Sequence, residues 1–293
     1  MKIARFRTTD GQVHVGRIEG DTACELTPHV STTECLGKLV AAEVGAFERL
    51  AAVPIGELRP HRLEDVQLLA PVTSPSKFLA IGLNYQSHAD ESRRIGVAQV
   101  ASQIWFNKQV SCIVGPGDAI DHPTIVEQLD YEAELGFVIG RKARNVRPDE
   151  ALDYIAAYTI VNDVSARDWQ KRSPTWTLGK SFDTHGPVGP WLVTPDEVGD
   201  PQNLELSLRV NGELRQQANT AQMIHDIRAQ VSYLSEVMTL MPGDIIATGT
   251  PAGVGVAMTP PQFLKDGDVV SIDIQSIGQL SNPVRANLSG VAR

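Results

Sequence analysis

The chain has 293 residues, 42% of them hydrophobic and 21% charged, which is enough for one large core or for a small module beside a larger domain. The net charge of −9, without a basic stripe, argues against a nucleic-acid partner. No apolar run is long enough to span a bilayer, and the first ten residues lack the apolar core of a signal peptide, so we expect no membrane partner.

Glycine, proline and cysteine usage narrows the fold and the compartment. The 24 Gly and 18 Pro predict many turns and hence a strand-rich fold. Cys24, Cys35 and Cys112 are odd in number and widely spaced, without a C-x-x-C pair. We therefore expect buried free thiols in a reducing, cytoplasmic environment.

Residues 1–70 are predicted to form a small N-terminal module. The segments 2–7 and 12–19 are typical of paired strands, and apolar residues at helical spacing predict a helix over about 35–52. The proline-containing segment 54–77 that follows is predicted to be a linker to the main body.

Residues 71–293 are predicted to form the main domain. A strand is expected at 77–82, followed by a short helical or mobile stretch at 84–96 and by strands at about 103–108 and 118–120. Three Gly-Asp turns precede apolar runs, at Gly117-Asp118, Gly243-Asp244 and Gly267-Asp268.

Two further elements complete the predicted domain. Asn211-Gly212, between two strand-like segments, is a strong β-hairpin signal. Apolar residues on one side of 220–240 predict a long helix that ends at Pro242-Gly243. Together these elements predict an α+β, strand-rich chain dominated by mixed or antiparallel sheet.

Three acidic residues in two strand-like segments indicate a metal site. Side chains at i and i+2 of a strand share a face, so Glu132 and Glu134 project together beside the apolar run 135–139. Adjacent buried carboxylates are costly unless a cation neutralises them, and hard divalent cations prefer carboxylate oxygens. Asp163, in a second apolar segment, is a candidate third ligand. The alternative is an amphipathic edge strand with Glu132 and Glu134 on its solvent face.

Five segments, in this order along the chain, resemble the fumarylacetoacetate hydrolase family, and within it the acylpyruvate hydrolase type. They are IGLNYQSHADE, LDYEAELGFVIG, VNDVSARDWQ, GKSFDTHGPVGPWLVT and MPGDIIATGTPAGVG, and the resemblance covers about residues 70–290. It implies a mixed β-sheet roll with a small N-terminal α+β module, assembled as a homodimer. It also implies Mg²⁺ or Mn²⁺ bound by Glu132, Glu134 and Asp163, which a 2-oxo acid substrate can chelate.

The same resemblance implies a catalytic pair on a lid that closes over the substrate. His88 and Glu91 are three residues apart and share one face of a helix, so the carboxylate can orient the imidazole as a base for water. The alternative is a solvated helix whose charges only keep it soluble.

Further polar residues receive roles from the resemblance. Lys180 is expected to hold the substrate oxyanion, whereas its sequence neighbours alone equally allow a surface lysine. Substrate-binding roles are implied for Arg167, Gln170, Thr250 and Tyr85. His185 stands where many relatives have an apolar or aromatic residue, so a substrate contact and a packing role both remain open.

These features predict hydrolysis of a carbon–carbon bond in a 2,4-dioxo acid, with His88 activating the attacking water and the metal stabilising the departing pyruvate enolate. The main alternative is oxaloacetate decarboxylation, or hydration or dehydration of a 2-oxo acid, at the same metal site. A non-catalytic metal-binding scaffold is the third possibility. None of these motifs specifies which dioxo acid is the substrate.

Overall fold

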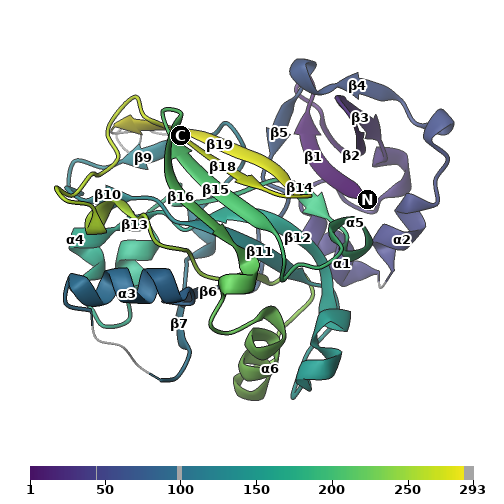
Figure 1. Ribbon diagram of the computed structural model, residues 1–293. Helices are drawn as coiled ribbons and strands as arrows, with labels where there is room; N and C mark the ends of the chain where they lie inside the picture. The colour runs from purple at the N-terminus through teal and green to yellow at the C-terminus, as the bar shows by residue number, and fades with distance from the viewer. Residues whose placement is uncertain (44, 98–100, 287–293) are drawn as a thin grey trace.

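The computed structural model describes residues 1–43, 45–97 and 101–286, and two large sheets dominate it (Figure 1). The larger is a mixed twelve-stranded sheet that extends from the N-terminal module into the main domain. Its strands follow in the spatial order β4 (Pro60–Arg62), β3 (Thr22–Glu25), β2 (Val13–Glu19), β1 (Lys2–Arg7), β14 (Gly186–Val193), β12 (Ile155–Asn162), β11 (Ala133–Ile139), β17 (Ile245–Ala247), β6 (Phe78–Gly82) and β7 (Ile104–Asn107), with β5 (Gln67–Leu69) beside β1 and β8 (Ile113–Val114) beside β14.

The second sheet has five strands and packs on the first. Its spatial order is β16 (Glu213–Asn219), β15 (Glu205–Val210), β18 (Val269–Ile274), β19 (Gly278–Ala286) and β9 (Ile120–His122). β15 and β16 form the predicted hairpin, and the turn residues Asn211 and Gly212 have left-handed φ angles of 52° and 82°. A separate ladder joins β10 (Leu129–Asp130) and β13 (Ser165–Ala166). The predicted strand-rich α+β fold is confirmed.

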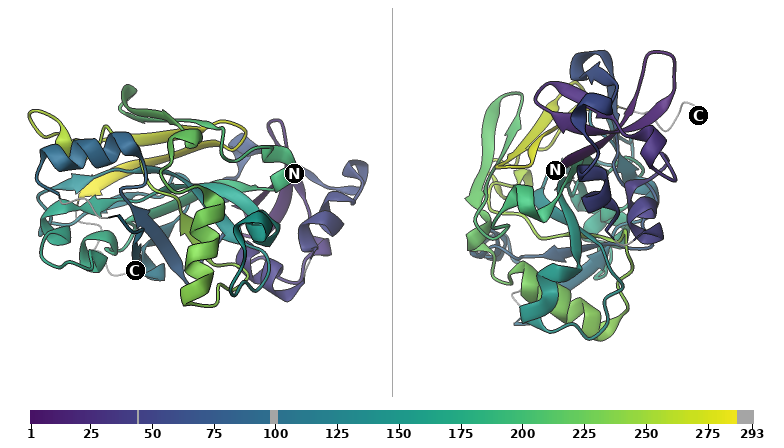
Figure 2. Two further views of the ribbon diagram at one scale, coloured as in Figure 1. Left: turned by 60° about the horizontal axis from the view of Figure 1, so that its bottom comes forward. Right: turned by 90° about the vertical axis from the view of Figure 1, so that its right-hand side faces the viewer.

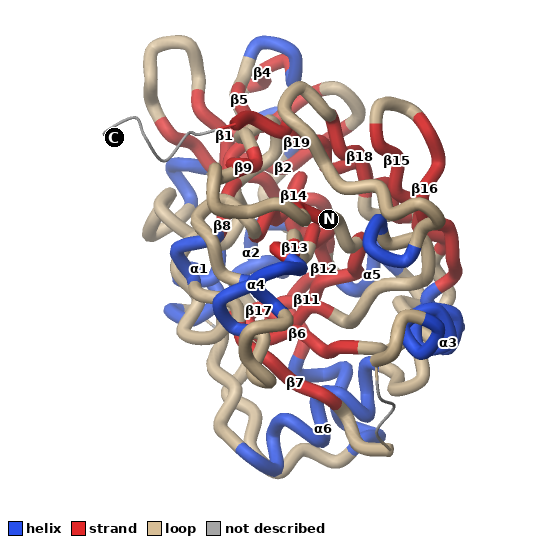
Figure 3. Tube along the Cα trace, turned by 90° about the vertical axis from the view of Figure 1, so that its left-hand side faces the viewer, coloured by secondary structure: helices blue, strands red, loops and turns tan. Residues whose placement is uncertain are grey.

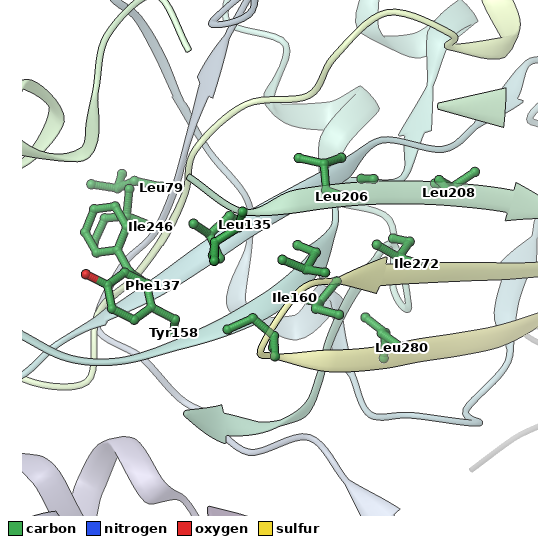
Figure 4. Close-up of a cluster of buried hydrophobic side chains, with 14 of the residues drawn as sticks. Leu79, Leu135, Phe137, Tyr158, Ile160, Leu206, Leu208, Ile246, Ile272 and Leu280 are labelled. Carbon is green, nitrogen blue, oxygen red and sulfur yellow. The ribbon is translucent and has the colours of Figure 1, made fainter. Parts of the chain in front are cut away.

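The main core lies between the two sheets, where apolar side chains of β11 and β12 meet those of β15, β18 and β19 (Figure 4). Leu135 and Phe137 of β11 are fully buried on this side. Val138 belongs to a second core on the other face of the sheet, which α1 (Leu36–Ala42) and α2 (Ala46–Ala51) cover. Because β11 is covered on both faces, any polar side chain along it must find its partners inside the protein.

The N-terminal module differs from its prediction in two places. The helix expected over 35–52 is divided into α1 and α2, and residue 44 between them lies outside the described residues. The linker expected at 54–77 contains β4 and β5, which pair with β3 and β1. Pro60 begins β4, a position at which a strand tolerates the missing N–H of proline.

Two predicted boundaries in the main domain are also corrected. The last helix, α6, covers Ile227–Val237 instead of 220–240, because the Asp226 carboxylate accepts a hydrogen bond from the first turn at 2.7 Å and so sets the start of the helix. The strand expected at 118–120 begins only at its last residue, as β9.

The N-terminal module joins the main sheet edge to edge. β1 pairs with β14 in antiparallel register, with Ile3 opposite Leu192. Both views in Figure 2 show the purple module against the main domain. The far end of the molecule carries α3 (Gln86–Arg94) and α4 (Arg167–Gln170) together with the β10–β13 ladder, and Figure 3 looks onto this end.

Within the described ranges, no helix is both long and apolar enough to cross a membrane. The prediction of buried free thiols is confirmed, because Cys24, Cys35 and Cys112 are all buried and form no disulfide. Burial raises the pKa of the Cys112 thiol to about 11, which keeps it in the unreactive protonated form.

Candidate active site

The centre of the site lies where the antiparallel pair β11–β12 ends. Ala133 is opposite Asn162, so the next residues outward, Glu132 and Asp163, are neighbours, and the Asp163 amide donates to the Glu132 carbonyl at 2.9 Å. One carboxylate oxygen from each of Glu132, Glu134 and Asp163 lies within 4.8 Å of the other two. These three residues are between 0% and 5% exposed, so the alternative of a solvent-facing edge strand is wrong.

Two buried cationic side chains contact these carboxylates. Lys180 ends a short 3₁₀ turn over Thr177–Lys180, and its Nζ donates to Glu132 at 2.7 Å and to Asp163 at 2.5 Å. Arg167, the first residue of α4, forms an ion pair with Glu132 at 2.7 Å. Both side chains are buried, so neither is an exposed surface residue.

The two glutamates experience opposite electrostatic environments. Burial raises the pKa of Glu132, but neighbouring positive charges, that of Lys180 foremost, outweigh burial and hold this pKa below its usual range. Burial raises the pKa of Glu134 well above its usual value, and the charges of Asp163 and Glu132 add to the effect. The Gly249 amide donates to the Glu134 carboxylate at 2.7 Å. Among the residues that the structure describes, Glu134 has no ion pair of the kind that Glu132 forms, and a bound cation would relieve this repulsion.

Lys108, which follows β7, is a site residue that the sequence prediction missed. Its buried Nζ donates to Asp163 at 2.6 Å, to the Lys180 carbonyl at 2.6 Å and to the Val164 carbonyl at 3.3 Å. Lys108 therefore fastens the end of β12 to the turn that carries Lys180. A lysine after a short apolar strand has no distinguishing sequence signature, so no signal was available for it.

Asp130 on β10 is a second residue that was missed. Its fully buried carboxylate accepts hydrogen bonds from Arg167 Nε at 2.9 Å and from the amides of Gly255 and Val256 at 2.8 and 3.0 Å. It therefore fixes Arg167 and ties the loop after β17 to β10. A signal existed here, because Asp130 continues the two-residue spacing of the Glu-x-Glu pair.

α3 carries the predicted catalytic pair. His88 Nδ1 and Glu91 Oε2 are 3.1 Å apart, and both residues are buried, so this pair does not lie on a solvated helix face. The other carboxylate oxygen of Glu91 accepts the Gly253 amide at 3.0 Å, which fastens α3 to the loop after β17. Glu91 thus holds the imidazole by one nitrogen and leaves Nε2 of His88 for the cavity.

A cavity of about 140 Å³ lies between α3, α4 and the carboxylates. Its polar wall brings together predicted site residues from five segments of the chain: His88, Glu132, Glu134, Arg167, Gln170, Lys180 and Thr250. Glu91 and Asp163 lie directly behind this wall, bonded to His88 and Lys180. A larger cavity of about 620 Å³, beside α2, includes none of the predicted site residues.

Two further residues named from the sequence, Tyr85 and His185, also lie outside the cavity lining. Tyr85, the residue before α3, is completely buried, and burial together with the Glu134 charge raises the pKa of its phenol. His185 is also completely buried, with Nε2 2.9 Å from the Asp121 carbonyl and its ring packed on Phe182. Burial lowers the pKa of His185 to about 3, so it is neutral at physiological pH. Of the two roles left open for His185, the structure supports packing.

The carboxylate centre fits a hard divalent cation. It offers three carboxylate oxygens from three residues, all inside the protein and next to a cavity, and oxygen donors are the ligands that Mg²⁺ and Mn²⁺ prefer. Burial, and after it the charges of Asp163 and Glu132, raise the pKa of Glu134, so an ionised carboxylate at this position is costly without a bound cation. This buried acidic triad has the composition and placement of a divalent-metal site.

The fold and this buried acidic centre are those of an enzyme, and comparison with known proteins identifies the family. The model for the fumarylacetoacetate hydrolase C-terminal domain matches residues 77–285, and a model described as Rv2993c-like, N-terminal matches residues 1–71. The chain belongs to the fumarylacetoacetate hydrolase family.

Particular relatives span almost the whole chain. A mitochondrial oxaloacetate tautomerase of Xenopus laevis is 49% identical over 97% of this chain and 90% of its own length. The solved fumarylacetoacetate hydrolase of Exiguobacterium antarcticum is 38% identical, with a TM-score of 0.86 over 98% of this chain and 100% of that one. A maleylpyruvate hydrolase of a Sphingobium species, solved with manganese(II) and pyruvate, is 32% identical, with a TM-score of 0.82 over the same shares of the two chains.

Proposed function

We propose that this chain is a divalent-metal-dependent enzyme that interconverts the keto and enol forms of oxaloacetate. Glu132, Glu134 and Asp163 would hold the Mg²⁺ or Mn²⁺ ion. Two findings support the proposal: the buried acidic triad beside a small cavity, and the 49% identity to an oxaloacetate tautomerase along almost the entire chain.

The substrate and the triad are chemically complementary. Oxaloacetate offers a carboxylate oxygen and a 2-oxo oxygen, a chelating pair that suits a hard cation. When bound, the ion supplies the positive charge that favours the enolate form of the 2-oxo acid. Lys180, which is buried among the carboxylates, adds a fixed positive charge next to the same oxygen.

His88 would transfer the proton. Its Nδ1 is hydrogen-bonded to Glu91, so Nε2 is the nitrogen that can take a proton from C3 of the 2-oxo acid. Nε2 would then return this proton to the 2-oxo oxygen to give the enol. The reverse steps return the keto form, and no net proton is gained or lost. Arg167, Gln170 and Thr250 line the same cavity and would position the carboxylates of the substrate, while buried Tyr85 would support this wall.

The observation that carries the proposal is that His88, held by Glu91, lines the same 140 Å³ cavity as Glu132 and Glu134. Tautomerisation needs one base and stabilisation of one oxyanion, which His88 and Lys180 with a bound ion would supply. It needs no room for an attacking water, which suits so small a cavity. The small volume therefore favours proton transfer within a short acid over cleavage of a long one.

Enol absorbance measured with oxaloacetate tests the proposal. With Mg²⁺ or Mn²⁺ we expect the protein to accelerate approach to the keto–enol equilibrium, and we expect EDTA to abolish the acceleration. His88→Gln should lower the rate by about 10²–10⁴-fold, the usual contribution of a general base. His29→Gln, on the N-terminal module, is the matched control and should retain the rate. An unchanged rate in His88→Gln at saturating metal would refute the assigned role of His88.

Hydrolysis of a carbon–carbon bond in a 2,4-dioxo acid is the second candidate. The same His88–Glu91 pair can activate a water, and two structural relatives, 38% and 32% identical, are named as hydrolases. Pyruvate release from acetylpyruvate, measured beside pyruvate release from oxaloacetate, separates the outcomes. Faster release from acetylpyruvate than tautomerisation of oxaloacetate would make hydrolysis the main activity, and release from oxaloacetate alone would indicate the decarboxylase.

The homodimer, the cytoplasmic location and the choice between Mg²⁺ and Mn²⁺ stay predictions. Each can be measured separately from the reaction: the mass of the protein in solution, its distribution in fractionated cells, and its affinity for the two ions.

A further inference from the structure

The cavity has an apolar side, to which no role has yet been assigned. Its apolar lining residues are Ile81, Leu83, Ile95, Val97, Phe106, Trp176 and Val256. Two contacts connect this side to the ionic centre: Lys180 Nζ lies 4.9 Å from the centre of the Phe106 ring, and the Phe106 and Trp176 ring centres are 5.6 Å apart, edge to face. A ligand that reaches beyond Lys180 therefore passes Phe106 and meets Trp176.

Trp176 adopts a backbone conformation that is unusual for a bulky residue. Its φ angle is +60°, in the left-handed region, where a large side chain is strained. Its amide donates to the Ser173 carbonyl at 3.2 Å, and its carbonyl accepts the Lys180 amide at 3.2 Å, so it begins the turn that presents Lys180. The surrounding structure thus holds this residue in place at the cavity despite the strain.

The indole of Trp176 lies directly on the backbone of β6. A Cβ atom added to Gly82, the last residue of that strand, would be 2.5 Å from Cζ3 and 3.1 Å from Cη2 of the indole. Only glycine leaves room for the ring in this position. Because backbone lies behind the ring and Phe106 beside it, a ligand cannot push the ring toward either of them.

One charged side chain lies on this side of the cavity. Lys171 also lines the cavity, but it is exposed and its Nζ is directed to Gln128 at 3.4 Å. The total volume of about 140 Å³ is close to that of an engineered cavity of roughly 150 Å³ that holds a single benzene molecule. The small volume therefore restricts the length of the group that a ligand bound at the carboxylates can extend into the cavity.

We propose that Trp176 is the residue that determines substrate size: it closes the distal end of the cavity and restricts the enzyme to 2-oxo acids with a short distal group. The inference rests on the proposed function, because it takes the 2-oxo acid head to lie at Glu132, Glu134 and Asp163. It adds that the tail lies over Phe106 and ends at the indole.

Binding of 2-oxo acids that do not react tests the proposal without turnover. The probes are pyruvate and straight-chain 2-oxo acids with tails of increasing length, measured by calorimetry on the Mn²⁺-loaded protein. For the natural chain we expect affinity to fall once the tail exceeds two or three carbons. In Trp176→Ala, each further methylene should instead improve affinity about fourfold, because a buried methylene contributes about 0.8 kcal/mol. Trp176→Phe should give an intermediate limit.

The ratio of the affinities for long and short tails isolates the role of the Trp176 ring. Any disturbance of Lys180 by the substitution affects the common head of every probe equally, and so cancels when long and short tails are compared. Trp105→Ala is the matched control, since Trp105 precedes Phe106 on β7 and does not line the cavity. It should retain the length limit of the natural chain.

The outcomes separate the two proposals. An unchanged length limit in Trp176→Ala would overturn the inference and leave the proposed function standing. A limit that moves as expected in a protein that never turns over oxaloacetate or acetylpyruvate would support the inference and overturn the proposed function. If the Mn²⁺-loaded natural chain bound no 2-oxo acid at all, both would be wrong.

Discussion

A buried carboxylate lies near each end of β17, and the two carboxylates differ in their hydrogen-bond donors and counter-charges. Asp244, just before the strand, is completely buried and accepts hydrogen bonds from Ser76 Oγ at 2.5 Å, from the Lys77 amide and Nζ at 2.9 Å each, and from the Met241 amide at 2.8 Å. Glu134 belongs to the neighbouring strand β11 and lies near the other end of β17, where it accepts a hydrogen bond from the Gly249 amide and faces two further carboxylates.

This contrast shows what distinguishes a functional buried charge from a structural one. Asp244 has a donor for each oxygen and a lysine for its charge, so nothing is left for a ligand. The pKa of Glu134 is raised by burial and by the charges of Asp163 and Glu132, which outweigh the Lys180 charge and the Gly249 hydrogen bond. Burial alone does not mark a site, whereas burial without a counter-charge does.

The largest expected effect is that of removing the uncompensated charge. Glu134→Gln should abolish tight Mg²⁺ or Mn²⁺ binding and lower turnover a hundredfold or more, since a metal ion contributes several kcal/mol to such a transition state. Because the substitution also removes like-charge repulsion, the metal-free variant should unfold at a temperature no lower than the metal-free natural chain. Calorimetric metal titration and thermal unfolding measure both. A Glu134→Gln variant that is less stable and still binds metal would show that Glu134 is a structural charge like Asp244.

The matched substitution at the other end should do the opposite. Asp244→Asn places an amide among donors and leaves Lys77 without its counter-charge, so we expect a loss of stability of about 3–5 kcal/mol. Metal affinity should remain as in the natural chain, because Asp244 does not belong to the triad. Urea unfolding beside metal titration of the folded variant checks this. Weakened metal binding at full stability would show that Asp244 is not merely structural.

Lys108 allows a test of whether a bound metal ion can replace the positive charge of a structural lysine. Lys108→Met leaves the Asp163 carboxylate without one of its two lysines, and we expect the metal-free protein to lose roughly 3–5 kcal/mol of stability. Saturating Mn²⁺ should recover part of the loss, because the ion replaces the missing positive charge. The measurement is the unfolding free energy with and without metal. Equal losses under both conditions would show that Lys108 acts only through its two carbonyl contacts.

His185 should give the smallest effect at neutral pH, and one that grows as the pH falls. Its pKa is about 3 in the folded protein because of burial, against 6.5 as its ordinary value, so below pH 6.5 the unfolded chain binds a proton that the folded chain does not. The stability contributed by neutral His185 is therefore complete above pH 6.5 and is lost, by up to about 1.4 kcal/mol per pH unit, as pH falls toward 3. His185→Gln should show a shallower acid slope in denaturant unfolding, and parallel slopes would contradict the assignment.

Much of the site could be predicted from the sequence because its chemistry repeats at short range. The two-residue spacing placed Glu132 and Glu134 on one face of a strand, and the three-residue spacing placed His88 beside Glu91. Both are local geometric rules, independent of the rest of the fold. The hairpin at Asn211-Gly212 could be predicted for the same reason, since its turn depends on the two residues themselves.

The remainder depends on contacts that the sequence does not show. Lys108 acquires its role from the meeting of β7, β12 and the Lys180 turn, which are brought together only by the sheet order. Trp176 becomes part of the cavity because Gly82, far away in the chain, leaves room for its ring. The segment predicted to be a linker became β4 and β5 because β3 and β1 offered it free edges, a tertiary effect that local composition cannot reveal.

The pairing of β1 with β14 has a consequence for the N-terminal module. β14 lies between β1 and β12, so without the module its outer backbone groups would be exposed along Leu192 and Val193. An unpaired row of this kind is a template for adding a foreign strand. The module therefore protects the catalytic sheet from self-association, and a truncation that spares every site residue would still produce a protein prone to aggregate.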